Sequence, residues 1–262
     1  MPTDIQFSFD KIAIKRIDTY LDKPTIIFLH DSLGAIELWR DLPEKISIIT
    51  QCNVLIYDRQ GYGKSLPFSI KERSNNYLEH EADLLIKLLD FWNVEKPILF
   101  GHSDGASIAL IAAGKYPKKI MGLITEGAHV FVEEITLNGI YEAIEVYKTT
   151  NLKSRLQKYH GEKTEEMFWA WASTWTKEKY KFWNIECFLP TIECPALIIQ
   201  GEADEYGTLK QVQSIINGVK GDSKQLIIPN VKHTPHKEVP ELIIDTTAAF
   251  IIEKIVNRKP TI

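Results

Sequence analysis

A serine in this chain has the sequence surroundings that can make a hydroxyl group nucleophilic. Ser103 lies in Gly101-His102-Ser103-Asp104-Gly105, between an apolar run and a stretch of small residues. A serine hydroxyl reacts slowly unless a base takes its proton and a carboxylate orients that base. Gly-x-Ser-x-Gly at a sharp strand-to-helix turn exposes the side chain, because the glycines let strand and helix approach closely. We therefore interpret Ser103 as a candidate nucleophile.

Candidates for the acid and the base follow two later apolar runs. Asp204 comes shortly after the run 195–200, and His233 comes shortly after the run 225–228. The chain order serine, acid, histidine is the order found in open α/β sheets that carry such a turn. Other residues compete for these roles: Glu202, Glu205 and Glu126 for the acid, and His236 for the base.

His233 and His236 also raise the question of a metal site, because they stand three residues apart. Pro235 lies between them, and the sequence offers no nearby third ligand. The glycine-containing turn 58–65 does not have the spacing of a phosphate-binding loop. We therefore expect no metal, no nucleotide and no cofactor.

The elements that must hold these residues follow from the apolar pattern. Continuous apolar runs predict strands buried on both faces at 25–29, 54–57, 98–100, 120–124, 195–200 and 225–228. Helical spacing of apolar residues predicts helices at 36–49, 77–92, 104–115, 208–216 and 240–256. This alternation indicates an α/β fold with a doubly wound, mostly parallel sheet, whose ligands bind beyond the carboxyl ends of the strands. Residues 5–9 and 12–17 alternate in polarity and predict an antiparallel pair at one edge.

The alternation stops between residues 131 and 190, where only helices are predicted, at 135–147, 152–159 and 165–175. We expect a core made of 1–130 and 191–262 and an inserted all-helical cap at 131–190. The cap is rich in aromatic residues, most of which should hold it together. Trp169 and Trp171 of the cap, and Trp39 of the core, are the predicted lining of an apolar pocket above Ser103.

Bulk composition excludes several classes of protein. The chain has 262 residues, 44% hydrophobic and 25% charged, with a net charge of −4, which suits one large α/β domain and gives no sign of a nucleic-acid or membrane surface. Its three cysteines form no Cys-x-x-Cys pattern, and no secretory leader or apolar span is visible. We expect a cytoplasmic protein, monomeric or homodimeric, that acts on a small molecule.

Together these motifs resemble the α/β-hydrolase fold, in the capped form of serine esterases and lactonases. The matching residues are His30-Asp31-Ser32-Leu33-Gly34, the Gly101 to Gly105 turn, Gly201 to Asp204, and His233. The resemblance implies that Ser103 is the nucleophile, His233 the general base and later acid, and Asp204 the orienting carboxylate. It also implies that the backbone N–H groups of Ser32 and Asp104 bind the oxyanion. The family more often has His-Gly where this chain has His30-Asp31.

The expected reaction is hydrolysis of a carboxylic ester or lactone through an acyl-enzyme. Two alternatives remain open at this point. The same three residues could serve a carbon–carbon bond hydrolase or a proton-abstracting lyase. In that case cap residues could hold a substrate carboxylate: Lys148, Lys153, Arg155 and Lys158. The other alternative is a ligand-binding module with little hydrolysis.

Overall fold

One mixed sheet forms the centre of the protein. The computed structural model describes residues 9–66 and 73–257, and in this part of the chain seven strands pair in the order β1-β3-β2-β4-β5-β6-β7. Only β1 among them runs antiparallel to its neighbour. The strands are β1 (Ile14–Ile17), β2 (Thr25–Leu29), β3 (Asn53–Tyr57), β4 (Ile98–His102), β5 (Gly122–Glu126), β6 (Ala196–Gly201) and β7 (Ser223–Ile228). The predicted doubly wound, mostly parallel α/β sheet is confirmed.

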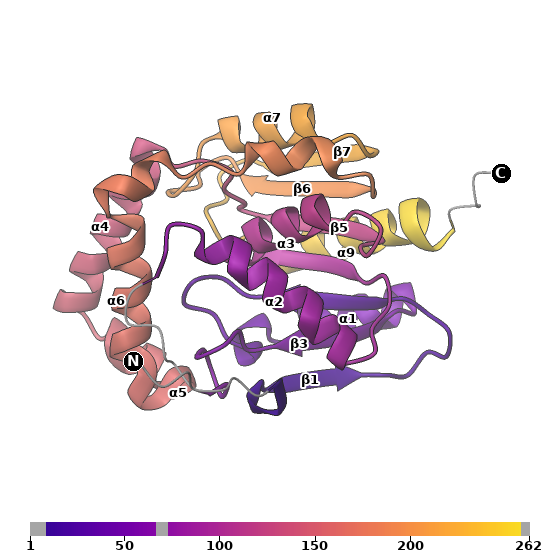
Figure 1. The fold of residues 1–262 in the computed structure, drawn as a ribbon, viewed down its shortest axis with the longest axis horizontal. Helices are drawn as coiled ribbons and strands as arrows, with labels where there is room; N and C mark the ends of the chain where they lie inside the picture. Colours follow the sequence, from indigo (N-terminus) through magenta and orange to yellow (C-terminus); the bar gives the residue numbers. More distant parts are fainter. Residues whose placement is uncertain (1–8, 67–72, 258–262) are drawn as a thin grey trace, which may run out of the picture.

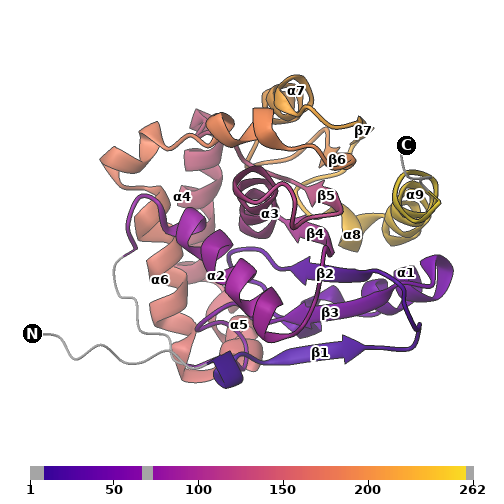
Figure 2. The same ribbon diagram turned by 45° about the vertical axis from the view of Figure 1, so that its right-hand side comes forward.

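Helices cover both faces of this sheet (Figures 1 and 2). Neighbouring residues of one strand belong to different cores, because successive side chains point to opposite faces. Leu99 packs in the core beneath α2 (Tyr77–Phe91), α3 (Asp104–Lys115) and α7 (Leu209–Gly218). Phe100 packs in the core beneath α1 (Leu42–Thr50) and α9 (Pro240–Ile251). This double burial explains the continuous apolar runs of the central strands.

Between β5 and β6 the chain forms helices and one isolated bridge, Phe131 to Asn184. Its helices are α4 (Glu134–Thr149), α5 (Leu152–His160) and α6 (Thr164–Trp175), with short 3-10 turns at Gly161–Lys163, Glu178–Phe182 and Glu186–Thr191. Figure 1 shows α4, α5 and α6 beside one end of the sheet, and Figure 2 shows the same arrangement after rotation. The inserted segment is helical, as predicted, and the assignment of 131–190 as a separate cap stays a prediction.

Several predicted elements differ from the observed ones. The strand predicted at 120–124 lies two residues later, as β5. The helix predicted at 36–49 is divided into a 3-10 turn, Ile36–Trp39, and α1, because Arg40 adopts a φ of 54° between them. Strand β1 pairs with β3 and not with a strand at 5–9; residues 5–8 lie outside the described residues, and Phe9–Lys11 is a 3-10 turn. The short helix α8 (Pro235–Glu238) was not predicted.

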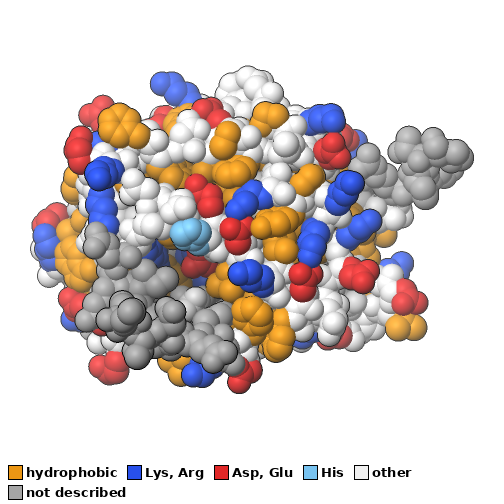
Figure 3. Space-filling model, viewed as in Figure 1, with side chains coloured by type: hydrophobic (Ala, Val, Ile, Leu, Met, Phe, Trp, Pro, Cys, Tyr) orange, Lys and Arg blue, Asp and Glu red, His pale blue; other side chains and the backbone are white. Residues whose placement is uncertain are grey.

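The surface carries charges of both signs. Figure 3 shows Lys and Arg side chains interspersed with Asp and Glu on the face viewed there. Many charged side chains pair, as Lys115 does with Asp83 and Lys119 with Asp90. Among the described residues no helix is both long enough and apolar enough to span a bilayer.

Candidate active site

The turn that carries Ser103 is as sharp as its glycines predict. Strand β4 ends at His102, α3 begins at Asp104, and Ser103 between them has φ 55° and ψ −120°. A Cβ atom on Gly101 would lie 2.3 Å from the carbonyl oxygen of Gly105, so no side chain fits there. The Ser103 N–H donates a 2.9 Å hydrogen bond to the carbonyl of Glu126 on β5. The backbone strain at Ser103 is therefore held by packing on both sides.

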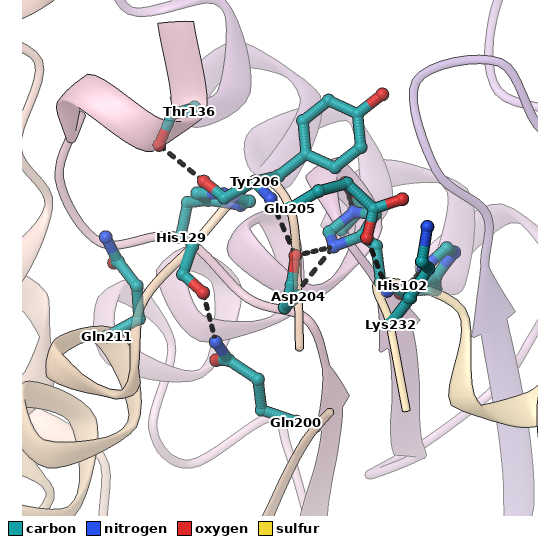
Figure 4. Close-up of polar contacts among 12 residues, drawn as sticks. His102, His129, Thr136, Gln200, Asp204, Glu205, Tyr206, Gln211 and Lys232 are labelled. Atoms are coloured by element: carbon teal, nitrogen blue, oxygen red, sulfur yellow. Dashed lines mark hydrogen bonds and ion pairs between the residues drawn. The ribbon is translucent and has the colours of Figure 1, made fainter. Parts of the chain in front are cut away.

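The structure brings Ser103, His233 and Asp204 together from three loops at the carboxyl ends of the strands. Nε2 of His233 lies 2.9 Å from Oγ of Ser103. Nδ1 of the same ring lies 2.9 Å from each carboxylate oxygen of Asp204. The Tyr206 N–H donates to Oδ1 of Asp204 at 2.8 Å and fixes that carboxylate, as Figure 4 shows. A carboxylate accepts only, so Nδ1 carries the hydrogen and Nε2 is free to accept the serine proton.

The electrostatics of this pair suit a base and its orienting acid. Burial opposes the charged form of His233, but the Asp204 carboxylate, together with the charges of Glu205 and Asp31, raises the pKa of the imidazole. Burial likewise opposes charge on Asp204, yet His233 holds the pKa of that carboxyl below its ordinary value. Each group therefore stabilises the charged form of the other.

The peptide that precedes Ser32 has a fixed orientation. The carbonyl of Asp31 accepts from Nδ1 of His30 at 2.7 Å and from Nη2 of the fully buried Arg59 at 3.0 Å. In a trans peptide the N–H points opposite to the C=O, so the Ser32 N–H is turned away from Arg59. Ser32 and Asp104 both line the cavity in which Ser103 lies. Asp31 is not among the described residues with positive φ.

The cavity beside Ser103 has a volume of about 220 Å³. The core contributes Ser103, His233 and Asp31, and helix α6 contributes Trp171 and Trp175. Three carboxylate side chains line the cavity: Asp31, Asp104 and Glu205. Asp204 lies behind His233 and is not among the lining residues. None of the described lining residues is Lys or Arg. The space is small, partly apolar and rich in negative charge.

Two predicted pocket residues lie elsewhere. Trp39 is 3% exposed and packs against Phe28, Phe100 and His236 in the core under α1 and α9. It does not line the cavity beside Ser103, because its ring is buried on the face of the sheet that α1 and α9 cover. Trp169 is half-buried on α6, where its ring packs against Tyr147 and Phe168 and its Nε1 donates to Glu165, and it does not line the cavity. Of the three predicted tryptophans, Trp171 is the one at the cavity.

The competing acids and base have other partners. Glu202 is exposed, and Glu205 accepts from the backbone N–H of His233 at 3.2 Å through Oε2. Glu126 bonds to His236, to its backbone N–H at 2.6 Å and to its Nδ1. Only Asp204 among these candidate acids bonds to the His233 ring in the described structure.

One group with the chemistry of a metal site occurs among the described residues. Ligand atoms of His102, Glu126 and His236 lie within 4.8 Å of one another, and all three side chains are buried. Both oxygens of Glu126 already accept hydrogen bonds from His236. The carboxylate of the cluster is therefore satisfied without a cation.

The structure adds site residues that the sequence pattern does not reveal. Oδ2 of Asp104 accepts from the Tyr77 hydroxyl at 2.8 Å and lies 3.6 Å from Nη2 of Arg59. His129, just beyond β5, lines the cavity and donates from Nε2 to the carbonyl of Tyr206 at 3.0 Å (Figure 4). These contacts join residues distant in sequence, so no local motif signals them.

Comparison with known proteins agrees with this architecture. The model of the alpha/beta hydrolase fold family matches residues 24–186. The human protein named serine hydrolase BPHL is 30% identical over 191 residues, which cover 70% of this chain and 64% of the relative, so the match leaves about a third of that protein uncovered.

Two solved structures share the fold. The deep-sea metagenome alpha/beta hydrolase enzyme MGS-M2 superposes with a TM-score of 0.76 at 18% identity, covering 96% of both chains. The enol-lactonase of Burkholderia xenovorans LB400 has a TM-score of 0.72 at 14% identity, covering 92% of this chain and 96% of its own.

The family model matches more than half of the sequence, and the strand order and the serine on the turn after β4 agree with it. This chain therefore belongs to the alpha/beta hydrolase fold family.

Proposed function

We propose that this chain is a serine hydrolase that cleaves a small carboxylic ester or lactone through an acyl-enzyme. The observation that carries the proposal is the unbroken hydrogen-bonded series Ser103 Oγ, His233 Nε2, His233 Nδ1 and Asp204, with 2.9 Å at each link. This is the geometry that activates a serine hydroxyl. The names of the relatives, a serine hydrolase and an enol-lactonase, support the same class of reaction.

The reaction follows from the positions of the protons. His233 accepts the hydroxyl proton at Nε2 while Ser103 Oγ attacks the substrate carbonyl carbon. The imidazolium then gives this proton to the departing alcohol oxygen, and the acyl group stays on Ser103. A water molecule repeats the attack with His233 again as the base, and the acid product leaves. Asp204 stays ionised throughout and stabilises the imidazolium.

The negative oxygen of the tetrahedral intermediate needs donors that are already in place. The backbone N–H groups of Asp104, at the start of α3, and of Ser32 are our proposed donors. The positive end of the α3 dipole adds to them. In measured cases the loss of one such donor raises the barrier by about 3 to 4 kcal/mol.

The charge around the cavity favours one kind of substrate. Asp31, Asp104 and Glu205 line it. Burial opposes charge on Asp31, yet His102, which is protonated at the low pH where Asp31 titrates, and the ammonium of Lys237 lower the pKa of Asp31 to about 2. Arg59 lies behind the cavity beside Asp104, but none of the described lining residues is a cation that could meet an anionic substrate. Lys148 and Lys153, which could have held a substrate carboxylate, pair instead with Glu145 and Glu165. The charge pattern therefore supports a neutral or positively charged ester over the carbon–carbon hydrolase or lyase with a dicarboxylate substrate.

A fluorophosphonate probe and an ester panel test the proposal. The probe should label the wild-type protein, and Ser103→Ala should abolish the labelling without changing the circular dichroism spectrum. p-Nitrophenyl esters of graded acyl length should be hydrolysed by the wild type and not by Ser103→Ala. A folded wild-type protein that is neither labelled nor active on any ester would favour the ligand-binding module instead.

A further inference from the structure

A second carboxylate–imidazole pair lies behind the triad and takes no part in the proposed reaction. Glu126, at the end of β5, accepts from the His236 N–H at Oε1 and from His236 Nδ1 at Oε2. Glu126 is fully buried and His236 is 7% exposed. Burial opposes charge on Glu126, but His236 holds the pKa of its carboxyl below the ordinary value. An ionised, fully buried carboxylate therefore anchors the start of α8.

His102 connects this pair to the general base. It is the register partner of Glu126 across β4 and β5, and its ring packs edge-on against His236 with 4.9 Å between centroids. Its Nε2 lies 2.9 Å from the backbone carbonyl oxygen of His233. A carbonyl only accepts, so His102 donates from Nε2. Burial lowers the pKa of His102 to about 4, which keeps the ring neutral in this tautomer.

The segment that holds His233 depends on such side-chain bonds, because it lies between β7 and α8 outside any strand or helix. The backbone N–H of His233 donates to Glu205 and its carbonyl accepts from His102, so both of its main-chain polar groups are held by side chains. Glu126 also accepts from the Ser103 N–H through its backbone. The cluster thus contacts the main chain of both the base and the nucleophile.

We propose that His102, Glu126 and His236 form a positioning unit that fixes His233 against Ser103 and Asp204. The three residues line no part of the cavity. They act on His233 through its main-chain carbonyl and through the His102 ring, which packs against the His233 ring with 5.1 Å between centroids. The inference rests on the proposed hydrolase reaction. A displacement of about 1 Å in a reacting group can lower a rate about 100-fold, which sets the expected size of the effect.

A pair of His102 variants separates positioning from simple packing. His102→Leu removes the donor, and His102→Gln retains an N–H that can reach the same carbonyl. We expect the rate of fluorophosphonate labelling, measured well below each unfolding transition, to fall about 100-fold in His102→Leu. His102→Gln should recover most of that loss. Thr125→Val is the matched control: Thr125 is fully buried on the same strand as Glu126, and its hydroxyl has no partner in the described structure. Its labelling rate should equal that of the wild type.

A spectroscopic measurement tests the same unit without any turnover. The Nδ1 proton of His233, bonded to Asp204, should give a low-field proton resonance that His233→Ala removes. We expect this resonance to shift or broaden in His102→Leu and to remain in Thr125→Val. If His102→Leu does not fold, Glu126→Gln, which keeps the shape but removes the charge, serves in both measurements.

The outcomes distinguish the two proposals. A wild-type protein that the probe does not label contradicts the hydrolase proposal, while the resonance still reports on the positioning unit. A folded His102→Leu with the wild-type labelling rate and resonance, or equal losses in His102→Leu and His102→Gln, would overturn the positioning unit.

Discussion

Gly127 lies against the ring of His233: a Cβ atom on this glycine would be 2.9 Å from Cε1 and 3.0 Å from Nδ1 of the imidazole. Gly127 also has a φ of 59°, a conformation that residues with a Cβ rarely adopt. The absence of a side chain directly after β5 therefore leaves room for the catalytic ring.

Gly127→Ala should consequently harm catalysis more than stability. The added methyl group must push the ring away from Ser103 or Asp204, so we expect the labelling rate of Ser103 to fall about 100-fold. Gly161→Ala is the matched control, because Gly161 has nearly the same φ, 58°, and nothing within 4 Å of an added Cβ. Both variants should lose about 1 to 2 kcal/mol of unfolding free energy, and only Gly127→Ala should lose reactivity. Equal reactivity in the two would show that the ring is not confined there.

The pH dependence of labelling should report the raised pKa of His233. The base accepts a proton only when neutral, so the labelling rate should rise with pH and reach half its maximum above about pH 6.5, the ordinary value. Asp204→Asn removes the charge that raises this pKa. We expect the midpoint to move to lower pH and the plateau rate to fall by about 10,000-fold, as in a serine-protease triad. A midpoint that stays unchanged in Asp204→Asn would mean that Asp204 is not the partner that sets the pKa.

Stability should depend on pH through the same pair. The pKa of His233 is raised on folding, so its contribution is complete below about pH 6.5 and is lost as pH rises through the folded value. The pKa of Asp204 is lowered, so its contribution is complete above about pH 3.9 and is lost as pH falls through the folded value. Both contributions are complete between these limits. Urea unfolding of the wild type and Asp204→Asn should differ most in that window, and a difference that keeps growing above it would contradict this assignment.

The sequence predicted the elements that a local pattern defines. Strand β2 occupies the predicted residues 25–29, and α3 the predicted 104–115, because double burial and small-residue helical spacing leave clear signatures. The three loops of the triad follow from the same logic, since parallel strands deliver their carboxyl ends to one edge. The sequence therefore predicted that Asp204 and His233 would lie beside Ser103.

The lining of the cavity could not be predicted in the same way. Trp39 and Trp171 both lie in predicted helices. Only the packing of those helices in the folded protein decides that Trp39 enters the core and Trp171 the cavity wall. His129 lines the cavity because of where its loop lies relative to the others, which no spacing encodes. Strand β1 pairs with β3, about 40 residues further along the chain, and a pairing between such distant segments leaves no local pattern in the sequence.

Tyr77 connects the helical layer to the nucleophile turn, and its loss should lower stability. Its hydroxyl donates to Asp104 and accepts from Nε1 of Trp175 at 2.9 Å on α6. Tyr77→Phe leaves a buried carboxylate oxygen and a buried indole N–H without this partner. We expect the free energy of unfolding to fall by about 1 to 3 kcal/mol. In the control Trp175→Phe the bond from Tyr77 to Asp104 is intact, so comparing the two variants divides the loss of unfolding free energy between the Asp104 bond and the Trp175 bond. No loss in Tyr77→Phe would mean that water replaces the hydroxyl.

Trp171 should limit the size of the acyl group, because it is the predicted tryptophan that lines the cavity, and it is 6% exposed. Replacing it by leucine keeps an apolar wall and opens space beside Ser103. In Trp171→Leu we expect the ratio of kcat/KM for medium-chain to short-chain p-nitrophenyl esters to rise about 10-fold. Trp169→Leu is the control, since Trp169 lies two positions away on the same helix and does not line the cavity. An equal change in both variants would mean that the helix as a whole, and not the Trp171 ring, sets the preference for chain length.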